Sequence, residues 1–444
     1  MNLTSQDEEN SELTTPLVFR VATRIIEKIA SHHISLDSSF QETINEFKLS
    51  PGEQRLAYFI SKKALEHIGI PIYILQKNKK ETLPLRRRAA FYVAFYLVFS
   101  SSSFTLEKIR AIRGGLLSDS LLTLLTSRNI DNVLEEIKGL PISLRLAYLE
   151  SIPPLLVESL LLRFGEREVE GAIKSFKNRQ VWVRLNREDK REWVEEYLEG
   201  RGFRIIRDKD YSYLLEAIPL KENPLPPLPP DVAVYQNKAS VIAVEALLSM
   251  NPRGIMVDLA AAPCMKASLL CLRGKTEYLL LVDVSEKRAR TCTETMKPSR
   301  CMYDILNSDG RIFGCSKSLD AAIVDAPCTN SGALPRDPGL RLALWELDKK
   351  DLEEMKAVQS AILTNALKLV RPGAPILYST CSVFTEEGED VLHTLKTPHV
   401  LNEPFLPPRL KKTIYESCRG CYRLFPHIHH TDGFFFSILS KKEE

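Results

Sequence analysis

The sequence lacks the features of a membrane or secreted protein. No apolar run approaches the roughly 20 residues that a helix needs to cross a bilayer. The stretch 89–99 is too short for that purpose and is typical of a buried helix. Residues 1–15 are polar and acidic, without the basic and apolar regions of a signal peptide. We therefore expect a soluble, cytoplasmic protein that does not associate with membranes.

The sequence also lacks an excess of charge and a disulfide pattern. Lys and Arg (60) nearly balance Asp and Glu (57), so a nucleic-acid partner must be inferred from local clusters rather than from net charge. The nine cysteines are odd in number and scattered, which favours reduced thiols over a disulfide framework. A chain of 444 residues is long enough for two or three domains.

The first third of the chain shows helical periodicity and no strand alternation. Apolar residues recur at helix-face spacing from Leu17 to about Ile137, and Ser50-Pro51-Gly52-Glu53 has the order of a helix cap. Two basic clusters follow, Lys77/Lys79/Lys80 and Arg86-Arg87-Arg88. They are compatible with phosphate contacts and equally with a solvated helix end.

The rest of the chain divides into a small segment and a large one. Residues 141–230 show two short helices (155–164 and 169–176), strands near 181–186 and 211–218, and a helix between them, before a proline-rich stretch. From residue 231 onward, strands alternate with helices, which predicts a doubly wound, mostly parallel sheet. The predicted domains are therefore 1–140, 141–230 and 231–444.

Two cysteines follow two predicted buried strands. Cys328 lies in Asp325-Ala326-Pro327-Cys328, after the apolar run 321–324, and Cys381 lies in Tyr378-Ser379-Thr380-Cys381-Ser382, after the run 375–377. Because the carboxyl ends of parallel strands share one crevice, we expect Cys328, Cys381 and Asp325 to meet there. Most free cysteines are inert core residues, but two at two strand ends favour chemistry.

Acidic residues follow other strand ends in the same region. The loop 258–266 joins the first predicted strand of this region to its helix, where cofactors bind in such folds. Asp283 is placed for ribose hydroxyls and Asp309 for an adenine, although each alone could be a cap or a surface residue. No Gly-x-Gly-x-x-Gly is present, which argues against a dinucleotide and favours S-adenosylmethionine.

These motifs together resemble the RsmB (Sun/Fmu) family of bacterial ribosomal-RNA cytosine-C5 methyltransferases. The matching motifs are the loop 258–266 (Asp-Leu-Cys-Ala-Ala-Pro-Gly-Gly-Lys in the family), the segment 325–332 (Asp-Ala-Pro-Cys-Ser-x-x-Gly in the family), Tyr-x-Thr-Cys-Ser at 378–382 with Glu386-Glu387, Asp-Gly-Phe-Phe at 432–435 and the Trp-hydrophobic-Arg-hydrophobic-Asn element at 182–186. The sequence departs from the family at Cys264-Met265, in place of Gly-Gly, and at 236–240 and 335–339.

The resemblance implies a fold, a reaction and a set of residues. It implies a NusB-like all-helical RNA-binding domain, a small α+β connecting domain and a C-terminal Rossmann-like class I methyltransferase domain. It assigns Cys381 as the nucleophile that adds to C6 of the cytosine, Cys328 as the residue that assists release, and Asp325 as a hydrogen-bonding partner of the base. The residues implied for S-adenosylmethionine are Asp258, Ala260, Ala261, Ala262, Pro263, Cys264, Met265, Lys266, Asp283, Asp309 and Asp325.

The implied substrate is 16S ribosomal RNA in an unfolded or partly assembled small subunit, methylated by a monomer. Two alternatives remain. The substrate could be transfer RNA, or the protein could be a catalytically impaired RNA-binding assembly factor, which Cys264-Met265 would explain. Cys418-x-x-Cys421 with His427, His429 and His430 has donors suited to zinc, but this segment also fits an active-site loop of the family. No metal is therefore expected, and Cys264 and Cys271 are expected to be packing thiols.

Overall fold

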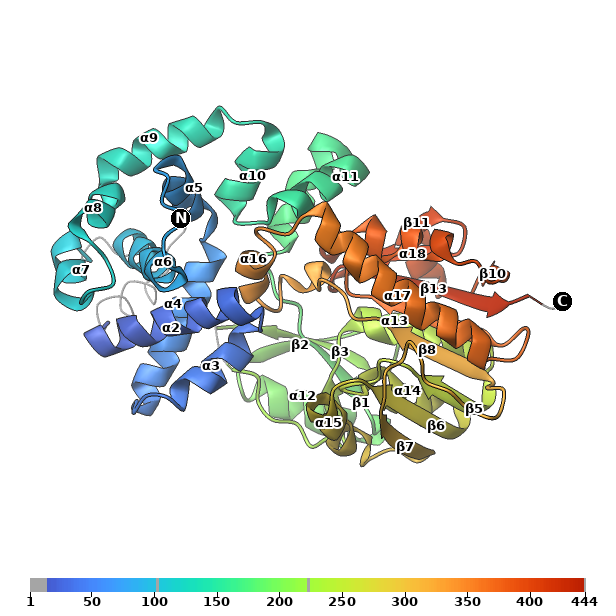
Figure 1. Ribbon diagram of the computed structural model, residues 1–444. Coiled ribbons are helices and arrows are strands. Elements are labelled where there is room, and N and C mark those ends of the chain that lie inside the picture. The colour runs from blue at the N-terminus through green and yellow to red at the C-terminus, as the bar shows by residue number, and fades with distance from the viewer. Residues whose placement is uncertain (1–13, 101–103, 222–223, 443–444) are drawn as a thin grey trace. The chain divides into compact units, whose positions relative to one another are not determined.

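The computed structural model describes residues 14–100, 104–221 and 224–442, and the chain divides into two compact units. The helical unit comprises Met1–Lys177 and Arg336–Asp348, and the sheet unit comprises Asn178–Pro335 and Lys349–Glu444 (Figure 1). Residues 141–177, which the sequence places in a connecting domain, thus group with the helical unit. No helix in the described part of the chain is long and apolar enough to span a bilayer.

The described residues of the helical unit form helices and no strand, so the all-helical prediction is confirmed. The helices are α2 (Pro16–His32), α3 (Leu36–Ile44), α4 (Pro51–Glu66), α5 (Gly69–Lys77), α6 (Leu85–Ser100), α7 (Leu106–Ile112), α8 (Asp119–Leu122), α9 (Ser127–Lys138), α10 (Ile142–Glu150), α11 (Pro154–Ser175) and α16 (Gly339–Ala343), with a 3-10 turn at Thr123–Leu125.

Local signals in the sequence account for several of these boundaries. The Ser50 hydroxyl accepts a hydrogen bond from the Glu53 amide, and the Glu53 carboxylate accepts one from the Ser50 amide, which is the capping box expected there. Gly165 takes a φ of 69° inside α11 and divides it into the two short helices that the periodicity predicts. These boundaries depend on neighbouring residues alone.

The α16 segment is a distant piece of sequence that completes the helical unit. The Arg341 side chain is buried, and its guanidinium donates hydrogen bonds to the carbonyl oxygens of Ser151 (2.8 Å) and Phe176 (2.9 Å). Trp345 joins the same apolar core as α2, α4 and α6. The stretch 336–348 is therefore held by buried hydrogen bonds and by apolar packing within this unit.

The sheet unit begins with a small antiparallel sheet of order β2-β3-β1-β4. Its strands are β1 (Trp182–Leu185), β2 (Phe203–Arg207), β3 (Leu214–Pro219) and β4 (Ala233–Tyr235), accompanied by a 3-10 turn at Glu188–Lys190 and by α12 (Arg191–Glu199). Two of the strands and the helix lie where the sequence predicts them. The prediction missed β4, which has three residues, and β2, whose pattern of one buried residue followed by mostly exposed ones gives a weak strand signal.

A second sheet of nine strands dominates the unit. Its strands are β5 (Arg253–Asp258), β6 (Lys275–Asp283), β7 (Met302–Asn307), β8 (Ala321–Asp325), β9 (Pro375–Thr380), β10 (His399–Asn402), β11 (Tyr415–Cys418), β12 (Cys421–Leu424) and β13 (Phe434–Lys441). The order is β11-β12-β13-β9-β8-β5-β6-β7, with β10 paired to β13. Strands β5 to β9 are parallel and the other four are antiparallel, so "mostly parallel" overstated the parallel part.

Helices cover both faces of this sheet, as the doubly wound prediction requires. They are α13 (Lys238–Ser249), α14 (Met265–Arg273), α15 (Glu286–Met296), α17 (Lys349–Leu369), α18 (Glu389–Thr394), α19 (Pro408–Thr413) and α20 (Pro426–His429). Helices α13, α14 and α15 pack on one face, through residues such as Met256 and Ile323, and α17 and α18 pack on the other, through Val257 and Val324. Alternate residues of each strand thus enter different cores, which explains the continuous apolar runs of β5 and β8.

Six of the nine cysteines form disulfides, which corrects the expectation of reduced thiols. Cys264 pairs with Cys292, Cys271 with Cys301, and Cys418 with Cys421. Cys264 and Cys271 are therefore not packing thiols, and the Cys418-x-x-Cys421 thiols are not available to zinc. Sequence spacing does not identify such pairs, because α14 meets α15 and the turn before β7 only in the folded sheet unit.

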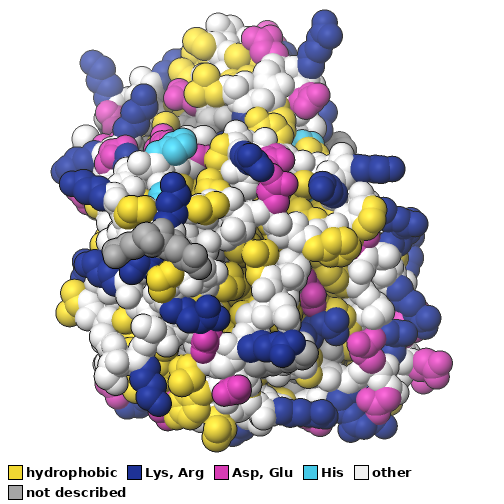
Figure 2. Space-filling model, turned by 90° about the vertical axis from the view of Figure 1, so that its right-hand side faces the viewer, with side chains coloured by type: hydrophobic (Ala, Val, Ile, Leu, Met, Phe, Trp, Pro, Cys, Tyr) yellow, Lys and Arg dark blue, Asp and Glu magenta, His cyan; other side chains and the backbone are white. Residues whose placement is uncertain are grey.

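On the face drawn in Figure 2, charged side chains are spread out rather than gathered in one patch. The face in Figure 2 carries Lys and Arg side chains at many separate places, with acidic side chains interspersed among them. This distribution agrees with the net charge of +3. A nucleic-acid site must therefore be sought in particular clusters.

Candidate active site

The two cysteine loops meet at the carboxyl ends of β8 and β9, as predicted. These strands are parallel neighbours, with Asp325 opposite Ser379 in the register. The sulfur atoms of Cys328 and Cys381 lie 3.3 Å apart, although 53 residues separate them in the chain. Residues 378–380 belong to β9 itself, so Cys381 is the first residue beyond the strand. Both thiols are half-buried and neither belongs to a disulfide.

Two glycines allow the loops to approach each other closely. The Gly332 amide donates to the carbonyl oxygen of Cys381 (3.0 Å), and the Gly433 amide donates to the carbonyl oxygen of Gly332 (2.9 Å). A Cβ atom at Gly332 would lie 1.9 Å from the Gly433 carbonyl oxygen. Only glycine fits at this position, so the backbone itself holds the two cysteine loops together.

A buried glutamate anchors the Cys328 loop. The Glu387 carboxylate accepts hydrogen bonds from the Thr329 amide (2.8 Å), from the Thr329 hydroxyl (2.5 Å) and from the Gln359 amide nitrogen (3.1 Å). Gln359 also donates to the carbonyl oxygen of Pro327 (2.9 Å). Burial raises the pKa of the Glu387 carboxyl. These hydrogen bonds determine where the loop places Cys328.

A buried arginine, Arg423, anchors the Cys381 loop. The Arg423 guanidinium donates to the carbonyl oxygens of Ser382 (3.1 Å) and Phe384 (2.8 Å). Its charge is balanced by the Glu389 carboxylate, which accepts a hydrogen bond from Nε at 2.7 Å. A buried charge that is paired and fully hydrogen-bonded makes a rigid support.

Asp325 lies beside the thiols and is oriented by two side chains. Its Oδ2 pairs with Nζ of Lys266 (2.6 Å), and its Oδ1 accepts a hydrogen bond from the Ser379 hydroxyl (2.8 Å). The Lys266 side chain is almost fully buried, and its Nζ lies 3.4 Å from the Ser240 hydroxyl. The Asp325 side chain remains about one-third exposed, so its carboxylate is oriented and still accessible.

The acids predicted at neighbouring strand ends are present along the same edge. Burial, and next the negative charge of Asp325, raises the pKa of Asp258 to about 7. The Asp283 carboxylate accepts hydrogen bonds from the amides of Ala262 (3.1 Å) and Ser285 (3.0 Å). The Asp309 carboxylate is held by Arg311, whose hydrogen bonds lower the pKa of Asp309.

Two large apolar side chains next to these acids are exposed. Val284 follows Asp283 directly and is 68% exposed, and Ile312 follows Asp309 by three residues and is 80% exposed. A Cβ atom at Gly310 would lie 2.3 Å from the carbonyl oxygen of Leu259, so the Asp309 loop packs tightly against the end of β5. Exposed apolar residues beside fixed carboxylates are suited to a flat, polar ligand.

Cys264 stands where the RsmB family has a glycine, and its backbone has a conformation that glycine commonly adopts. It takes a left-handed conformation with a φ of 67°, and its side chain is fully buried. The sulfur atom is bonded to Cys292 in α15. The disulfide thus gives the Cys264 side chain a fixed position within the protein.

The Trp182–Asn186 element of the small sheet supports the end of the loop 258–266. The buried Arg184 guanidinium donates to the carbonyl oxygen of Met265 (3.2 Å) and to the Ser268 hydroxyl (3.0 Å). Gln236 donates to the same Met265 carbonyl oxygen (3.1 Å). Burial lowers the pKa of Arg184 to about 10, so the guanidinium remains charged at neutral pH.

Sequence reasoning missed Asn330, the residue that contacts the two thiols. The Cys381 thiol donates to Oδ1 of Asn330 at 2.8 Å, and the Cys328 sulfur lies 3.9 Å from the same oxygen. Asn330 takes a left-handed conformation with a φ of 57°, which asparagine tolerates better than most residues. Its place two residues after Cys328 was the only available signal. Gln359 was missed as well, because nothing in α17 marks it.

Comparisons with known proteins match the part of the chain that forms this site. Residues 245–440 match the family described as "16S rRNA methyltransferase RsmB/F". This segment is thus similar to the RsmB/F family of methyltransferases. The predicted resemblance is thereby confirmed for the part of the chain that carries both cysteine loops.

Curated relatives match about half of the chain. Ribosomal RNA small subunit methyltransferase F of Escherichia coli strain E24377A is 31% identical over 221 residues, and the match covers 47% of this chain and 44% of that protein. The protein of the same name from Shigella boydii gives the same values. The chain therefore matches less than half the length of these relatives.

Some solved structures resemble this chain over a longer stretch than the segment 245–440. The protein PH0851 is 23% identical with a TM-score of 0.71, and the match covers 96% of this chain and 99% of that one. NSun6 from Pyrococcus horikoshii, solved with SFG, is 20% identical with a TM-score of 0.54, and the match covers 67% of this chain and 100% of that one. At such identities these likenesses concern the fold.

Proposed function

We propose that this protein transfers a methyl group from S-adenosylmethionine to C5 of a cytosine in 16S ribosomal RNA. The observation that carries the proposal is the meeting of Cys328 and Cys381 at 3.3 Å beside Asp325. C5 of cytosine is a poor nucleophile. Addition of a thiolate to C6 makes the ring an enamine, and its C5 becomes reactive.

In this mechanism Cys381 adds to C6 and Cys328 assists release. The hydrogen bond with Cys381, together with burial, raises the pKa of the Cys328 thiol well above its ordinary value. A thiol that keeps its proton is a poor nucleophile, which suits Cys328 to the release step and leaves Cys381 as the proposed attacking residue. After the methyl group has been added, the C5 proton must leave before the Cys381–C6 bond breaks.

Asp325 holds the base in the orientation that the addition requires. Its carboxylate, oriented by Lys266 and Ser379, can accept hydrogen bonds from protonated N3 or from the exocyclic amine of the cytosine. Such a hydrogen bond is strongest when the ring carries the extra proton of the adduct, so it stabilises that state preferentially. The target base must leave its stack to reach this position, as in other enzymes that act on a single base.

The edge formed by Asp258, Asp283 and Asp309 fits S-adenosylmethionine. Val284 and Ile312 present exposed apolar surface for an adenine, and Asp283 retains lone pairs for ribose hydroxyls. The loop 260–265 has no glycine-rich phosphate cradle, which suits a donor without phosphate groups. When bound, S-adenosylmethionine supplies an electrophilic methyl group. The proposed binding residues are those of the sequence prediction.

The first test is methyl transfer by two cysteine variants. We expect Cys381→Ala to abolish transfer of labelled methyl groups to 16S ribosomal RNA while it leaves S-adenosylmethionine binding by calorimetry close to that of the wild type. We expect Cys328→Ala to accumulate a covalent protein–RNA complex that survives denaturing electrophoresis, because release is blocked after addition. Methyl transfer by the Cys381→Ala protein would overturn the assignment of the nucleophile.

The two alternatives predict different results in the same assays. An RNA-binding assembly factor without activity would show no heat of S-adenosylmethionine binding. A transfer-RNA methyltransferase would label transfer RNA instead of ribosomal RNA. Bisulfite sequencing of both RNA classes, from cells with and without the protein, identifies the modified cytosine and separates the two substrates.

A further inference from the structure

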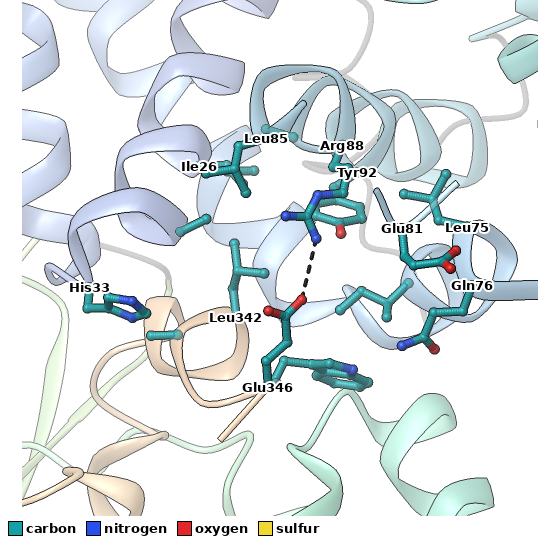
Figure 3. A pocket seen from close by; sticks show the side chains of 15 residues that line it. Ile26, His33, Leu75, Gln76, Glu81, Leu85, Arg88, Tyr92, Leu342 and Glu346 are labelled. Carbon is teal, nitrogen blue, oxygen red and sulfur yellow. Dashed lines mark hydrogen bonds and ion pairs between the residues drawn. The ribbon is translucent and has the colours of Figure 1, made fainter. Parts of the chain in front are cut away.

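The helical unit contains a pocket that the proposed chemistry does not use. It has a volume of about 80 Å³ and lies between α2, α5, α6 and the α16 segment (Figure 3). Ile26, Leu85, Leu342 and the ring of Tyr92 form apolar walls, and polar side chains stand at its edge. A pocket of this size can hold a flat heterocyclic ring.

Arg88 supplies the main hydrogen-bonding group of this pocket. Its Nη1 lies 3.4 Å from a carboxylate oxygen of Glu346, whose side chain is 83% exposed, and Figure 3 shows the two facing each other. Its Nε is buried and has no hydrogen-bond partner among the described residues. A long ion pair to an exposed carboxylate contributes little, so the guanidinium has donors left for a ligand.

Both basic clusters of the sequence lie next to residues that line the pocket. Lys77, Lys79 and Lys80 stand between the lining residues Gln76 and Glu81, and Arg86 and Arg87 stand between Leu85 and Arg88. Lys79, Arg86 and Arg87 are exposed, whereas Lys77 is paired with Glu136 at 2.6 Å. Exposed positive charge is thus placed within two residues of an apolar pocket that contains an arginine.

We propose that this pocket binds one unstacked base of single-stranded RNA, while the basic clusters hold the neighbouring phosphates. The inference rests on the proposed function, because it assigns a second contact to the same RNA substrate. The base would lie against the apolar walls and Tyr92, and Arg88 would donate to a carbonyl or ring-nitrogen acceptor on its edge. Lys79, Arg86 and Arg87 would contact phosphates outside the pocket.

The test separates the pocket from the charge. Ala343 lines the pocket, so Ala343→Leu fills it and leaves every charge in place; Ala30→Leu does the same from α2. The double variant Arg86→Ser/Arg87→Ser removes two charges and leaves the pocket open. Matched controls are Ala111→Leu, an exposed alanine of α7, and Lys174→Ser, an exposed lysine of α11. Thermal unfolding midpoints check that each variant is folded.

Binding of a short single-stranded ribo-oligonucleotide is measured by fluorescence anisotropy at several salt concentrations. We expect Ala343→Leu to weaken binding by about tenfold or more without changing the salt slope, because one stacked base is lost. The slope of log K against log salt is negative. We expect Arg86→Ser/Arg87→Ser to make it less steep by about 1.4. An abasic nucleotide at one position should weaken binding to the wild type but not to Ala343→Leu.

Three outcomes overturn the inference. One is that both pocket-filling variants bind the oligonucleotide as the wild type does. Another is an unchanged salt slope in Arg86→Ser/Arg87→Ser. The third is a wild type that methylates RNA but does not bind the single strand, which would leave the pocket to another partner. A wild type that neither binds nor methylates RNA would instead contradict the proposed function itself.

Discussion

Replacing Asp258 by asparagine should stabilise the protein, and more strongly as the pH rises. Asp258 is fully buried at the end of β5, and its pKa is raised from 3.8 to about 7 by burial and by the charge of Asp325. The folded state therefore binds a proton that the unfolded state releases between these two values. A carboxyl group of this kind destabilises the folded state progressively as the pH rises from about 4 to 7.

The magnitude follows from the difference between the two pKa values. A shift of about three units at 1.36 kcal/mol per unit corresponds to a destabilisation of about 4 kcal/mol above pH 7. At pH 5 the unfolded state has already lost most of its proton, and the same relation gives about 2 kcal/mol. Asp258→Asn keeps the shape of the side chain and removes the charge, so it should recover these amounts.

Urea unfolding of the wild type and of Asp258→Asn at pH 5 and pH 8 measures the effect. We expect the variant to be more stable at both values, with the larger gain at pH 8. Asp309→Asn is the control. Hydrogen bonds from Arg311 lower the pKa of Asp309, so its charged carboxylate stabilises the folded state instead of destabilising it. That control should be slightly less stable than the wild type at pH 8. An Asp258→Asn gain that does not grow with pH would refute the reasoning.

Three further predictions concern the supports of the site. Gly332→Ala should abolish methyl transfer, because its Cβ would lie 1.9 Å from the Gly433 carbonyl oxygen; unchanged activity would contradict the close contact of the two loops. Glu387→Ala should destabilise the protein by about 2 kcal/mol or more in urea unfolding, because it leaves buried donors without an acceptor, and Glu387→Gln should lose less. A reductant, or Cys292→Ser, should lower the unfolding midpoint, because the bond to Cys264 links residues 28 positions apart and such a link stabilises by about 3.6 kcal/mol; thiol counting before and after reduction is the check.

Local sequence was sufficient for much of the architecture. The buried parallel strands β5, β8 and β9 are short apolar runs because both of their faces are covered, and such runs are visible without a structure. The capping box at Ser50 and the break at Gly165 are also local, since each depends on the conformations of a few adjacent residues. The convergence of Cys328 and Cys381 followed from strand ends alone, because parallel strands place those ends at one edge.

Other elements could not be recognised in this way. Strand β7 was missed because it is an edge strand with no fully buried residue, and β10, β11 and β12 were missed because their pairing with β13 and with one another brings together segments that are separate in sequence. A short strand at an edge has a weak hydrophobic pattern, so its partner determines it more than its own residues do.

The sequence by itself predicted the residues that we propose carry the chemistry, and the kind of fold on which they lie. Only the tertiary structure decided what supports them: the contact of Asn330 with the thiols, the anchoring of Thr329 by Glu387 across 58 residues, and the bond between Cys264 and Cys292. Residue type and short-range spacing report the local backbone. A contact between residues tens of positions apart has no such local signature, because packing of the whole unit creates it.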